Sequence, residues 1–362
     1  MKLLRLHAEN FRNIEQAALS FEKTSTFLLG RNGQGKTNLL EAAGMVTALR
    51  SFRTTETRAL IRHHQRQARL FVVCEREGEG TSEITLGFSS SGKDIQCDGE
   101  KVTRLADFLG RFPTVTLSSE DIQLIRGGPA LRRRFLDMTL SSLRADYFEA
   151  LRRYHRALKE RNQLLKTGTG PREAELSAFD KALAPAAVTV CRLRREGVEA
   201  LGGDLRAAYA VISDGAEEPE LRYRPESAFE DTESALKCLR ENRSADLMLK
   251  STQRGPHRDD LDLRVGSRKA REYASEGQQR SLVVSLRLAQ MASFEQSSGV
   301  RPVIMADDVL GELDPPRRER FWRAIGPDRQ IIATGTEPPP AGERDWDMVS
   351  VADGMFERSA GQ

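Results

Sequence analysis

The chain has 362 residues, of which 39% are hydrophobic and 30% are charged, and its net charge is +3. This length predicts about two domains, and so small a net charge does not by itself indicate nucleic-acid binding. No apolar run approaches the roughly 20 residues of a membrane-spanning helix. The start Met1–His7 is strand-like rather than a signal-peptide apolar segment, so we expect no export. Four widely spaced cysteines argue against a zinc site or a disulfide framework. We therefore expect a cytoplasmic protein without a membrane partner.

Residues 1–30 contain three candidate strands, Lys2–His7, Ala18–Phe21 and Ser25–Leu29. The third leads into Gly30–Thr37, which fills each fixed position of the phosphate-binding loop G-x-x-x-x-G-K-[ST]. Good helix formers follow from Asn38 without a breaker. This strand-to-helix context favours a nucleotide-binding loop over an accidental glycine turn.

Each residue type in this loop suits a phosphate ligand. Glycines let successive backbone N–H groups and the helix N-terminus point at anionic oxygens. Lys36 is expected to reach the β- and γ-phosphates, and the Thr37 hydroxyl to bind Mg²⁺. The candidate nucleotide-binding residues here are Gly30, Arg31, Asn32, Gly33, Gln34, Gly35, Lys36, Thr37 and Asn38. We predict that the chain binds a nucleoside triphosphate.

The stretch from Arg50 to Arg69 is basic, with little acid. A solvated loop and a contact with phosphate or DNA are both open interpretations. Apolar residues then alternate or cluster in Leu70–Glu75 and Glu83–Phe88, which predicts a β-hairpin. We expect an α/β lobe with antiparallel strands added beside the phosphate-binding loop.

The middle of the chain is helical in pattern. Apolar residues recur at helical spacing over Leu131–Leu165, and Ala174–Leu205 is a second helical stretch, kinked or interrupted at Pro185. We predict that the two form a short antiparallel arm. The segment Arg126–Lys166 holds eleven Lys or Arg against four Asp or Glu, which is either a solvated face or a DNA-binding surface. The candidate DNA contacts are Arg132, Arg133, Arg152, Arg153 and Arg156.

Beyond the arm, Glu217–Glu241 is acidic and rich in turn residues, and we interpret it as a loop and a small helix. Alternation returns in Leu261–Val265, and the apolar run Pro302–Asp308 predicts a strand that ends in two carboxylates. Further strands are expected at Gln330–Thr334 and Met348–Val351.

Asp307 follows its strand directly, so its carboxylate is expected at the carboxyl edge of the sheet, beside the phosphate-binding loop. There it would bind Mg²⁺, and Asp308 would polarise the attacking water; a simple acidic turn is the alternative. Because Lys36 and Asp307 lie far apart along the chain, the helical region must be an insertion. We predict a discontinuous α/β head, residues 1–125 and 251–362, and an inserted helical arm domain, residues 126–250.

Further motifs resemble those of ABC-type P-loop ATPases. The run Ser275–Gln279 opens a predicted helix and resembles their signature motif, which serves nucleotide bound by the opposite subunit. Glu312–Asp314 resembles their D-loop, and Gln123 resembles the Q-loop glutamine that senses Mg²⁺ and the γ-phosphate. The resemblance adds Ser275, Gly277 and Gln278 to the nucleotide-binding candidates. It makes Gln123 a catalytic candidate beside Lys36 and Asp308, and a metal-binding candidate beside Thr37 and Asp307.

Blocks along nearly all of the chain resemble the RecF family of bacterial recombination mediators. They are Leu4–Asn13, Gly30–Thr37, Arg254–Asp260, Ser275–Arg280 and Asp307–Asp314. The short arm without a zinc hook favours this family over the long-armed SMC proteins. Two features depart from the ABC pattern. The switch histidine is absent, so Thr334 or Thr336 is expected to stand in, and the second acid is Asp308 rather than a glutamate, which suggests slow hydrolysis.

The resemblance implies an ATP-dependent, Mg²⁺-dependent homodimer that binds duplex DNA or gapped junctions between single-stranded and duplex DNA. It implies a weak DNA-dependent ATPase that acts as a switch in recombinational repair, replication and the SOS response. RecR is the implied partner, and RecO and RecA the functional ones. The alternative is an ATPase subunit of a membrane transporter, against which the basic insertion and the missing histidine argue.

Overall fold

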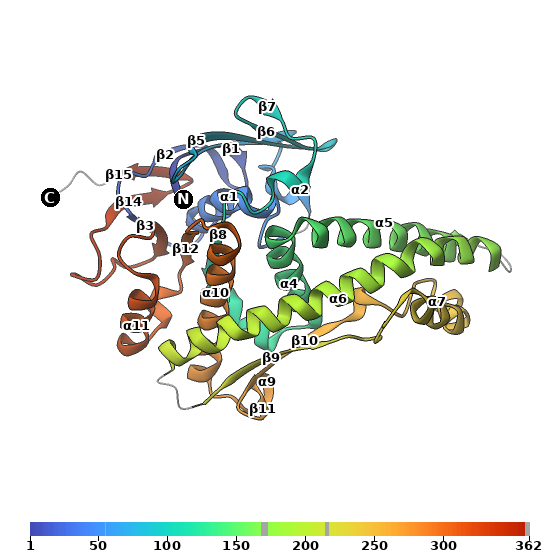
Figure 1. Cartoon of the computed structure of the whole chain (residues 1–362). Coiled ribbons are helices and arrows are strands. Elements are labelled where there is room, and N and C mark those ends of the chain that lie inside the picture. Colours follow the sequence, from blue (N-terminus) through green and yellow to red (C-terminus); the bar gives the residue numbers. More distant parts are fainter. Residues whose placement is uncertain (55, 168–172, 214–216, 359–362) are drawn as a thin grey trace. The chain divides into compact units, whose positions relative to one another are not determined.

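The computed structural model describes residues 1–54, 56–167, 173–213 and 217–358 (Figure 1). These residues form two compact units. The first unit comprises Met1–Ile122, Ala208–Ala216 and Arg280–Gln362. The second comprises Gln123–Ala207 and Glu217–Gln279. In the described part of the chain, no helix has both the length and the apolar composition that crossing a membrane requires.

An antiparallel sheet forms one layer of the first unit, with its strands in the order β2-β1-β4-β5-β6-β7. The bounds are β1 (Lys2–Phe11), β2 (Ile14–Ser20), β4 (Gln67–Arg76), β5 (Gly80–Ser89), β6 (Gly92–Cys97) and β7 (Glu100–Lys101). Burial alternates along β5, as expected when one face of a sheet covers the core. The hairpin of β4 and β5 confirms the sequence prediction.

A mostly parallel sheet carries the predicted phosphate-binding loop. Its strand order is β15-β14-β3-β13-β12-β8, and all strands except β15 run parallel. The bounds are β3 (Ser25–Leu29), β8 (Thr114–Ser118), β12 (Val303–Asp307), β13 (Ile331–Gly335), β14 (Asp347–Ala352) and β15 (Met355–Arg358). Each residue of β12 is buried, which explains its unbroken apolar run.

Helix α1 (Lys36–Ala48) contacts strands of both sheets. Its Leu39 and Met45 belong to one core with Leu6 of the antiparallel sheet and Met305 of the parallel sheet. The other helices of this unit are η1 (Thr57–Leu60), α2 (Leu105–Phe108), η2 (Ser119–Ile122), η4 (Leu310–Glu312) and α11 (Pro315–Ile325). Because α1 is packed on two sides, its apolar residues are not restricted to one face.

The second unit is mainly helical. Its helices are α3 (Gln123–Arg126), α4 (Pro129–Leu143), α5 (Ala145–Thr167), α6 (Glu173–Ile212), α7 (Thr232–Glu241), α8 (Arg243–Leu249), η3 (Pro256–Arg258) and α9 (Ala270–Tyr273). Helices α5 and α6 run antiparallel, with Arg161 bonded to Asp180 and Tyr147 bonded to Arg194. The last turns of α6 belong to the first unit, and α10 (Glu276–Ser298) begins in the second unit and continues in the first.

Helix α6 runs through Pro185 without interruption, so of the two outcomes expected there, a kink or an interruption, the interruption is wrong. Proline removes one backbone hydrogen bond and costs about 3 kcal/mol in a helix interior. On both sides of Pro185, Leu183, Ala184, Ala187 and Val190 are buried. Burial of this apolar stripe offsets the missing hydrogen bond.

A small sheet completes the second unit, in the order β11-β10-β9. Its strands are β9 (Pro219–Arg224), β10 (Asp260–Val265) and β11 (Arg268–Lys269). We expected a loop at β9, because Glu217–Glu241 is acidic and rich in turn residues. β9 pairs with β10 along its whole length, so residues 251–279 belong to this unit rather than to the predicted head.

Two buried arginines hold the second unit together. Arg161 of α5 donates to Asp180 of α6 at 2.8 Å and to Asp246 of α8 at 2.7 Å. Arg194 of α6 forms ion pairs of 2.8 Å with Asp137 and with Asp259. Buried charges are tolerated only when they are paired, so these contacts fix how the helices and the loop before β10 pack.

His257 has a structural role in this loop. Its Nε2 donates to the carbonyl of Thr252 at 2.9 Å, so its Nδ1 accepts from the hydroxyl of Tyr154 at 2.6 Å. Burial lowers the pKa of His257 to about 4, so the ring is neutral at pH 7. His257, like the buried Asp259 of the same resembling block, therefore serves packing in this unit.

Replacing Arg161 by alanine is expected to destabilise the second unit by about 3–5 kcal/mol, because Asp246 stays buried without its guanidinium partner. The matched control is Arg156→Ala on the same helix, which removes an exposed pair with Glu160 and costs at most about 1 kcal/mol. Urea unfolding followed by circular dichroism measures both. Equal midpoints would contradict the assigned role of Arg161.

Candidate nucleotide-binding site

The phosphate-binding loop is packed closely against the parallel sheet. The N–H of Gly30 donates to the carbonyl of Gly335 on β13 at 3.2 Å. A Cβ at Gly30 would lie 2.3 Å from the carbonyl oxygen of Val351 on β14, so only glycine fits there. Gly35 has a φ of 111°, a conformation that side chains disfavour. The motif glycines are thus required by the backbone path of the loop.

Lys36 directs its ammonium group into the loop. Its Nζ donates to the carbonyl oxygens of Gly30 at 2.7 Å and Arg31 at 3.1 Å. These carbonyls hold the ammonium within the loop. Its predicted contact with the β- and γ-phosphates stays a prediction.

Three segments meet at the carboxylate of Asp307. The hydroxyls of Thr37 on α1 and Thr334 on β13 each donate to its Oδ1 at 2.9 Å. The N–H of Asp308 donates to the Thr334 hydroxyl at 3.0 Å. Parallel register places Asp307 opposite Thr334, and β13 lies between β12 and the strand that leads into the loop. The sheet therefore brings together residues that are remote in sequence.

The carboxylate of Asp307 suits a divalent cation. Asp307 is 7% exposed, and burial raises its pKa, against the lowering effect of the two threonine hydroxyls. It forms no ion pair with any residue that the structure describes. A buried carboxylate without an ion-pair partner among the described residues, beside a hydroxyl, offers the oxygen ligands that Mg²⁺ prefers. Thr37 and Asp307 would hold this ion.

Asp308 has a φ of 52°, in the left-handed region. Among residues other than glycine, Asp and Asn enter this region most readily. Its side chain is partly exposed, in contrast to that of Asp307. The two adjacent acids thus have different environments, which supports different roles.

The sequence pattern did not identify Asn13 as part of this site. Its Nδ2 donates to the carbonyl of Gly33 at 3.3 Å, and Nδ2 of Asn38 donates to its Oδ1 at 2.6 Å. From the other side, the N–H of Gly354 donates to the carbonyl of Gln34 at 2.9 Å. Turns of both sheets therefore support the loop. The resembling block that ends at Asn13 was the available signal.

A buried ion pair fixes the same turn to α1. Glu41 is fully buried, and Arg12 donates to it through Nε at 2.9 Å and through Nη2 at 2.7 Å. Ser51 also donates to Glu41, and Arg53 donates to Oδ1 of Asn38 at 2.8 Å. A bidentate arginine–carboxylate pair gives directional stability, so it holds Asn13 in place against the loop.

The predicted signature residues lie in the second unit. Ser275 and Gln278 form a capping box at the start of α10: the N–H of Gln278 donates to Oγ of Ser275 at 3.2 Å, and the N–H of Ser275 donates to Oε1 of Gln278 at 2.7 Å. Ser275 is exposed, and Gly277 is partly buried. Their contact with nucleotide stays a prediction.

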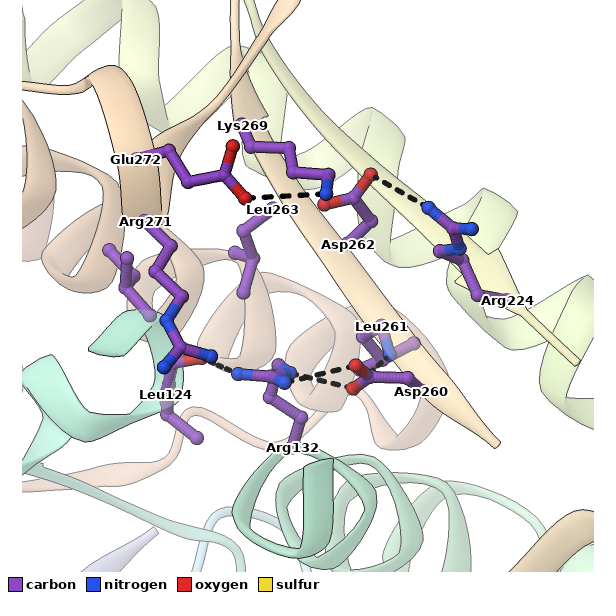
Figure 2. Close-up of a pocket in the computed structure, with 11 residues that line it drawn as sticks. Leu124, Arg132, Arg224, Asp260, Leu261, Asp262, Leu263, Lys269, Arg271 and Glu272 are labelled. Atoms are coloured by element: carbon purple, nitrogen blue, oxygen red, sulfur yellow. Dashed lines mark hydrogen bonds and ion pairs between the residues drawn. The ribbon is translucent and has the colours of Figure 1, made fainter. Parts of the chain in front are cut away.

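Gln123 opens α3 in the second unit and is exposed, and its role also stays a prediction. Behind α3 lies a hollow of about 350 Å³, shown in Figure 2. Ion pairs line it: Arg132 with Asp260, Lys269 with Glu272, and Arg224 with Asp262. Because its charges are largely paired, we assign no ligand to it.

The predicted DNA-binding arginines have different environments. Arg132 is buried and donates to both carboxylate oxygens of Asp260, so it is not available to DNA and the prediction is corrected there. Arg133 is partly buried and donates to the carbonyl of Asp259. Arg152, Arg153 and Arg156 are exposed on α5. They remain candidates for DNA contact.

The parallel sheet, the phosphate-binding loop and the acid at the end of β12 define the head of a P-loop protein of the RecF/RecN/SMC class. The RecF/RecN/SMC N-terminal domain family matches residues 2–340. A solved Smc head bound to a winged-helix domain of ScpA shares the fold, with a TM-score of 0.55 and 16% identity over 99% of this chain and 97% of that chain.

More specific relatives narrow the class. The DNA replication and repair protein RecF of Synechococcus sp. is 36% identical over 93% of this chain and 91% of the relative, and that of Leptospira interrogans is 36% identical over 93% and 92%. A solved recombination mediator protein RecF with ATP, in the RecFOR pathway, has a TM-score of 0.89 and 30% identity over 99% and 97%. The chain belongs to the RecF family of DNA replication and repair proteins. This membership excludes the transporter alternative.

Substitutions of Asp307 and Asp308 are expected to affect different properties, nucleotide binding and hydrolysis respectively. Asp307→Asn keeps an acceptor for both threonines but removes the metal-directed charge, so affinity for Mg²⁺-ATP should fall at least about tenfold. Asp308→Asn suits the left-handed backbone and should leave binding unchanged while hydrolysis slows about 100-fold. Titration with a fluorescent ATP analogue, with Mg²⁺ or EDTA, and a phosphate-release assay measure these effects. Equal loss of binding in both variants would contradict the separate roles.

Proposed function

We propose that the chain is an ATP-dependent DNA-binding switch of recombinational repair and replication. ATP with Mg²⁺ assembles a homodimer, the dimer holds duplex DNA or a gapped junction, and slow hydrolysis releases it. Its partners in this proposal are RecR, RecO and the recombinase RecA, whose loading onto single-stranded DNA it assists. The RecFOR pathway named for a solved relative supports RecR and RecO as partners.

One observation carries the nucleotide assignment: the buried carboxylate of Asp307, which forms no ion pair with a described residue, bonds to the hydroxyl of Thr37, next to Lys36 in the loop. In this arrangement Lys36 neutralises the outer phosphates, while Thr37 and Asp307 hold Mg²⁺. When bound, the metal would offset the charge that develops on the transferred phosphoryl group. Asp308 would orient and polarise the attacking water.

Slow hydrolysis has support in the same geometry. Thr334 occupies the end of β13, near where the ABC pattern has a histidine, and its hydroxyl is engaged with Asp307 and with the N–H of Asp308. A threonine hydroxyl carries no charge at neutral pH, whereas histidine can accept and carry a proton. A site with this substitution suits a switch that remains in its ATP state, rather than a fast enzyme.

In this proposal, Ser275 is the residue that links nucleotide binding to dimerisation. In a symmetric head-to-tail dimer, each of two equivalent sites combines the loop of one subunit with the signature serine of the other. ATP would bind this dimer better than the monomer and therefore stabilise it. Gln123 would report on Mg²⁺ and the γ-phosphate in the subunit's own site.

The test is sedimentation of the protein with and without ATP and duplex DNA. Wild-type chain should form a dimer that binds DNA only with ATP, whereas Lys36→Met should stay monomeric. Ser275→Arg should still bind ATP as a monomer, because its own loop is intact, but should not dimerise. ATP-driven dimers of either variant would contradict composite sites.

Mixing the two variants tests complementation. One Lys36→Met subunit supplies an intact signature and one Ser275→Arg subunit an intact loop, so a mixed dimer contains one complete site. Partial recovery of ATPase in the mixture, with none in either variant alone, is the expected result. Recovery to the wild-type rate, or none under conditions that dimerise the wild type, would contradict the model of one loop and one signature per site.

The exposed arginines of α5 are expected to bind DNA phosphates. Replacing Arg152, Arg153 or Arg156 by alanine should each time lower the slope of log K against log salt by about 0.9 on any DNA sequence. Arg323→Ala on α11 is the matched control, because Arg323, like Arg156, forms an exposed pair with a glutamate four residues away. If the salt slope is unchanged in the α5 variants, these arginines form a solvated surface and do not contact DNA.

A further inference from the structure

Gln279 makes an unusual set of contacts for a residue of the signature segment. It is 7% exposed, and its Nε2 donates to the carbonyls of Ala270 at 3.1 Å and Ala274 at 3.2 Å. Its Oε1 accepts from Nε of Arg126 at 2.7 Å. One buried amide therefore connects α9, the segment before α10 and the end of α3.

These contacts determine the position of Ser275. Ala274 directly precedes it, and Gln279 holds the carbonyl of Ala274. Gln278 closes the capping box on the serine itself. Two adjacent glutamines thus fix the backbone on both sides of Ser275. Gln278 would face the nucleotide in our proposal, whereas Gln279 is buried.

Arg126 connects this arrangement to Gln123. Both residues belong to α3, a single helical turn, so Gln123 moves with Arg126. Arg126 also lies 4.0 Å from the carboxylate of Glu276 in the first turn of α10. The connection is therefore made to the turn that presents Ser275.

The packing between α3 and α9 is incomplete. The hollow of Figure 2 has Leu124 and Ile125 of α3 on its wall together with Arg271 and Glu272 of α9. Where apolar contact is incomplete, a directional hydrogen bond determines the relative position of the two segments. The Arg126–Gln279 bond supplies this link.

We infer that Arg126 and Gln279 are positioning residues that make Gln123 and Ser275 move as one body. The inference rests on the proposed function, in which Gln123 senses the subunit's own nucleotide and Ser275 serves its partner's. ATP bound in one subunit then orders the serine that this subunit presents to the second site. The two sites of the dimer consequently fill cooperatively.

The test compares Arg126→Ala, Arg126→Lys and Gln279→Ala with Arg271→Ala. Arg271 is a suitable control because it is an exposed arginine of the same unit and forms no side-chain hydrogen bond or ion pair with a residue that the structure describes. Nucleotide affinity is measured on dilute monomer, and dimer formation is followed by sedimentation across an ATP titration. Circular dichroism confirms that each variant is folded.

Arg126→Ala is expected to leave monomer affinity within about twofold, because its own loop is intact. The ATP concentration for half-dimerisation should rise about tenfold, the scale of one hydrogen bond to a charged group, and the Hill coefficient should fall toward one. Arg126→Lys should recover part of both. Arg126→Ala combined with Gln279→Ala should be no worse than the more affected single variant, since both remove one interaction.

The inference would be overturned if Arg126→Ala dimerised with the same ATP midpoint and the same Hill coefficient as Arg271→Ala. It would also be overturned by additive effects in the double variant, or by a loss of monomer affinity equal to the loss of dimerisation. If the unsubstituted chain itself does not dimerise with ATP, the proposed function fails instead. The two failures are therefore distinguishable. If Gln279→Ala does not fold, the comparison of Arg126→Ala with Arg126→Lys still decides the question.

Discussion

The candidate nucleotide-binding site depends on one buried carboxylate that forms no ion pair with a described residue. Asp307 is buried at the end of β12, where two threonine hydroxyls stabilise it and no guanidinium or ammonium of the described residues pairs with it. In the proposed site, a divalent cation would neutralise this carboxylate and would also meet Thr37 and the loop. The same hydrogen bonds join α1, β12 and β13. The site therefore keeps its geometry only while these two strands stay neighbours in the sheet and α1 stays packed beside them.

Much of this site could be predicted because its information is local. The loop motif is contiguous, and a buried strand followed directly by an acid places that acid at a sheet edge. The signature segment is also contiguous and was recognised by its resemblance to the ABC motif; in the structure, Ser275 and Gln278 form a capping box within one turn. In each case neighbouring residues alone specify the conformation.

Other features depend on partners that no local pattern reveals. Asn13 supports the loop only because an antiparallel hairpin of another sheet turns beside it. β9 appears polar along the chain and becomes a strand through its pairing with β10, which also moves residues 251–279 into the helical unit. Arg132 lies in a basic segment that suggests DNA contact, yet its side chain is buried and forms an ion pair with Asp260. Charge counted along a sequence does not distinguish these outcomes.

The left-handed backbone at Asp308 has a consequence for the kind of acid that this position can hold. Asp and Asn are accommodated there because a short polar side chain bonds locally, whereas a longer acid lacks that compensation, and the conformation costs about 1–2 kcal/mol. A glutamate would extend one methylene closer to the water but would also strain the turn that follows β12. If Asp308 polarises the attacking water, as we propose, a glutamate at this position would gain reach only together with backbone strain. The backbone torsion, as well as the acidity of the side chain, therefore limits which acid this position can hold.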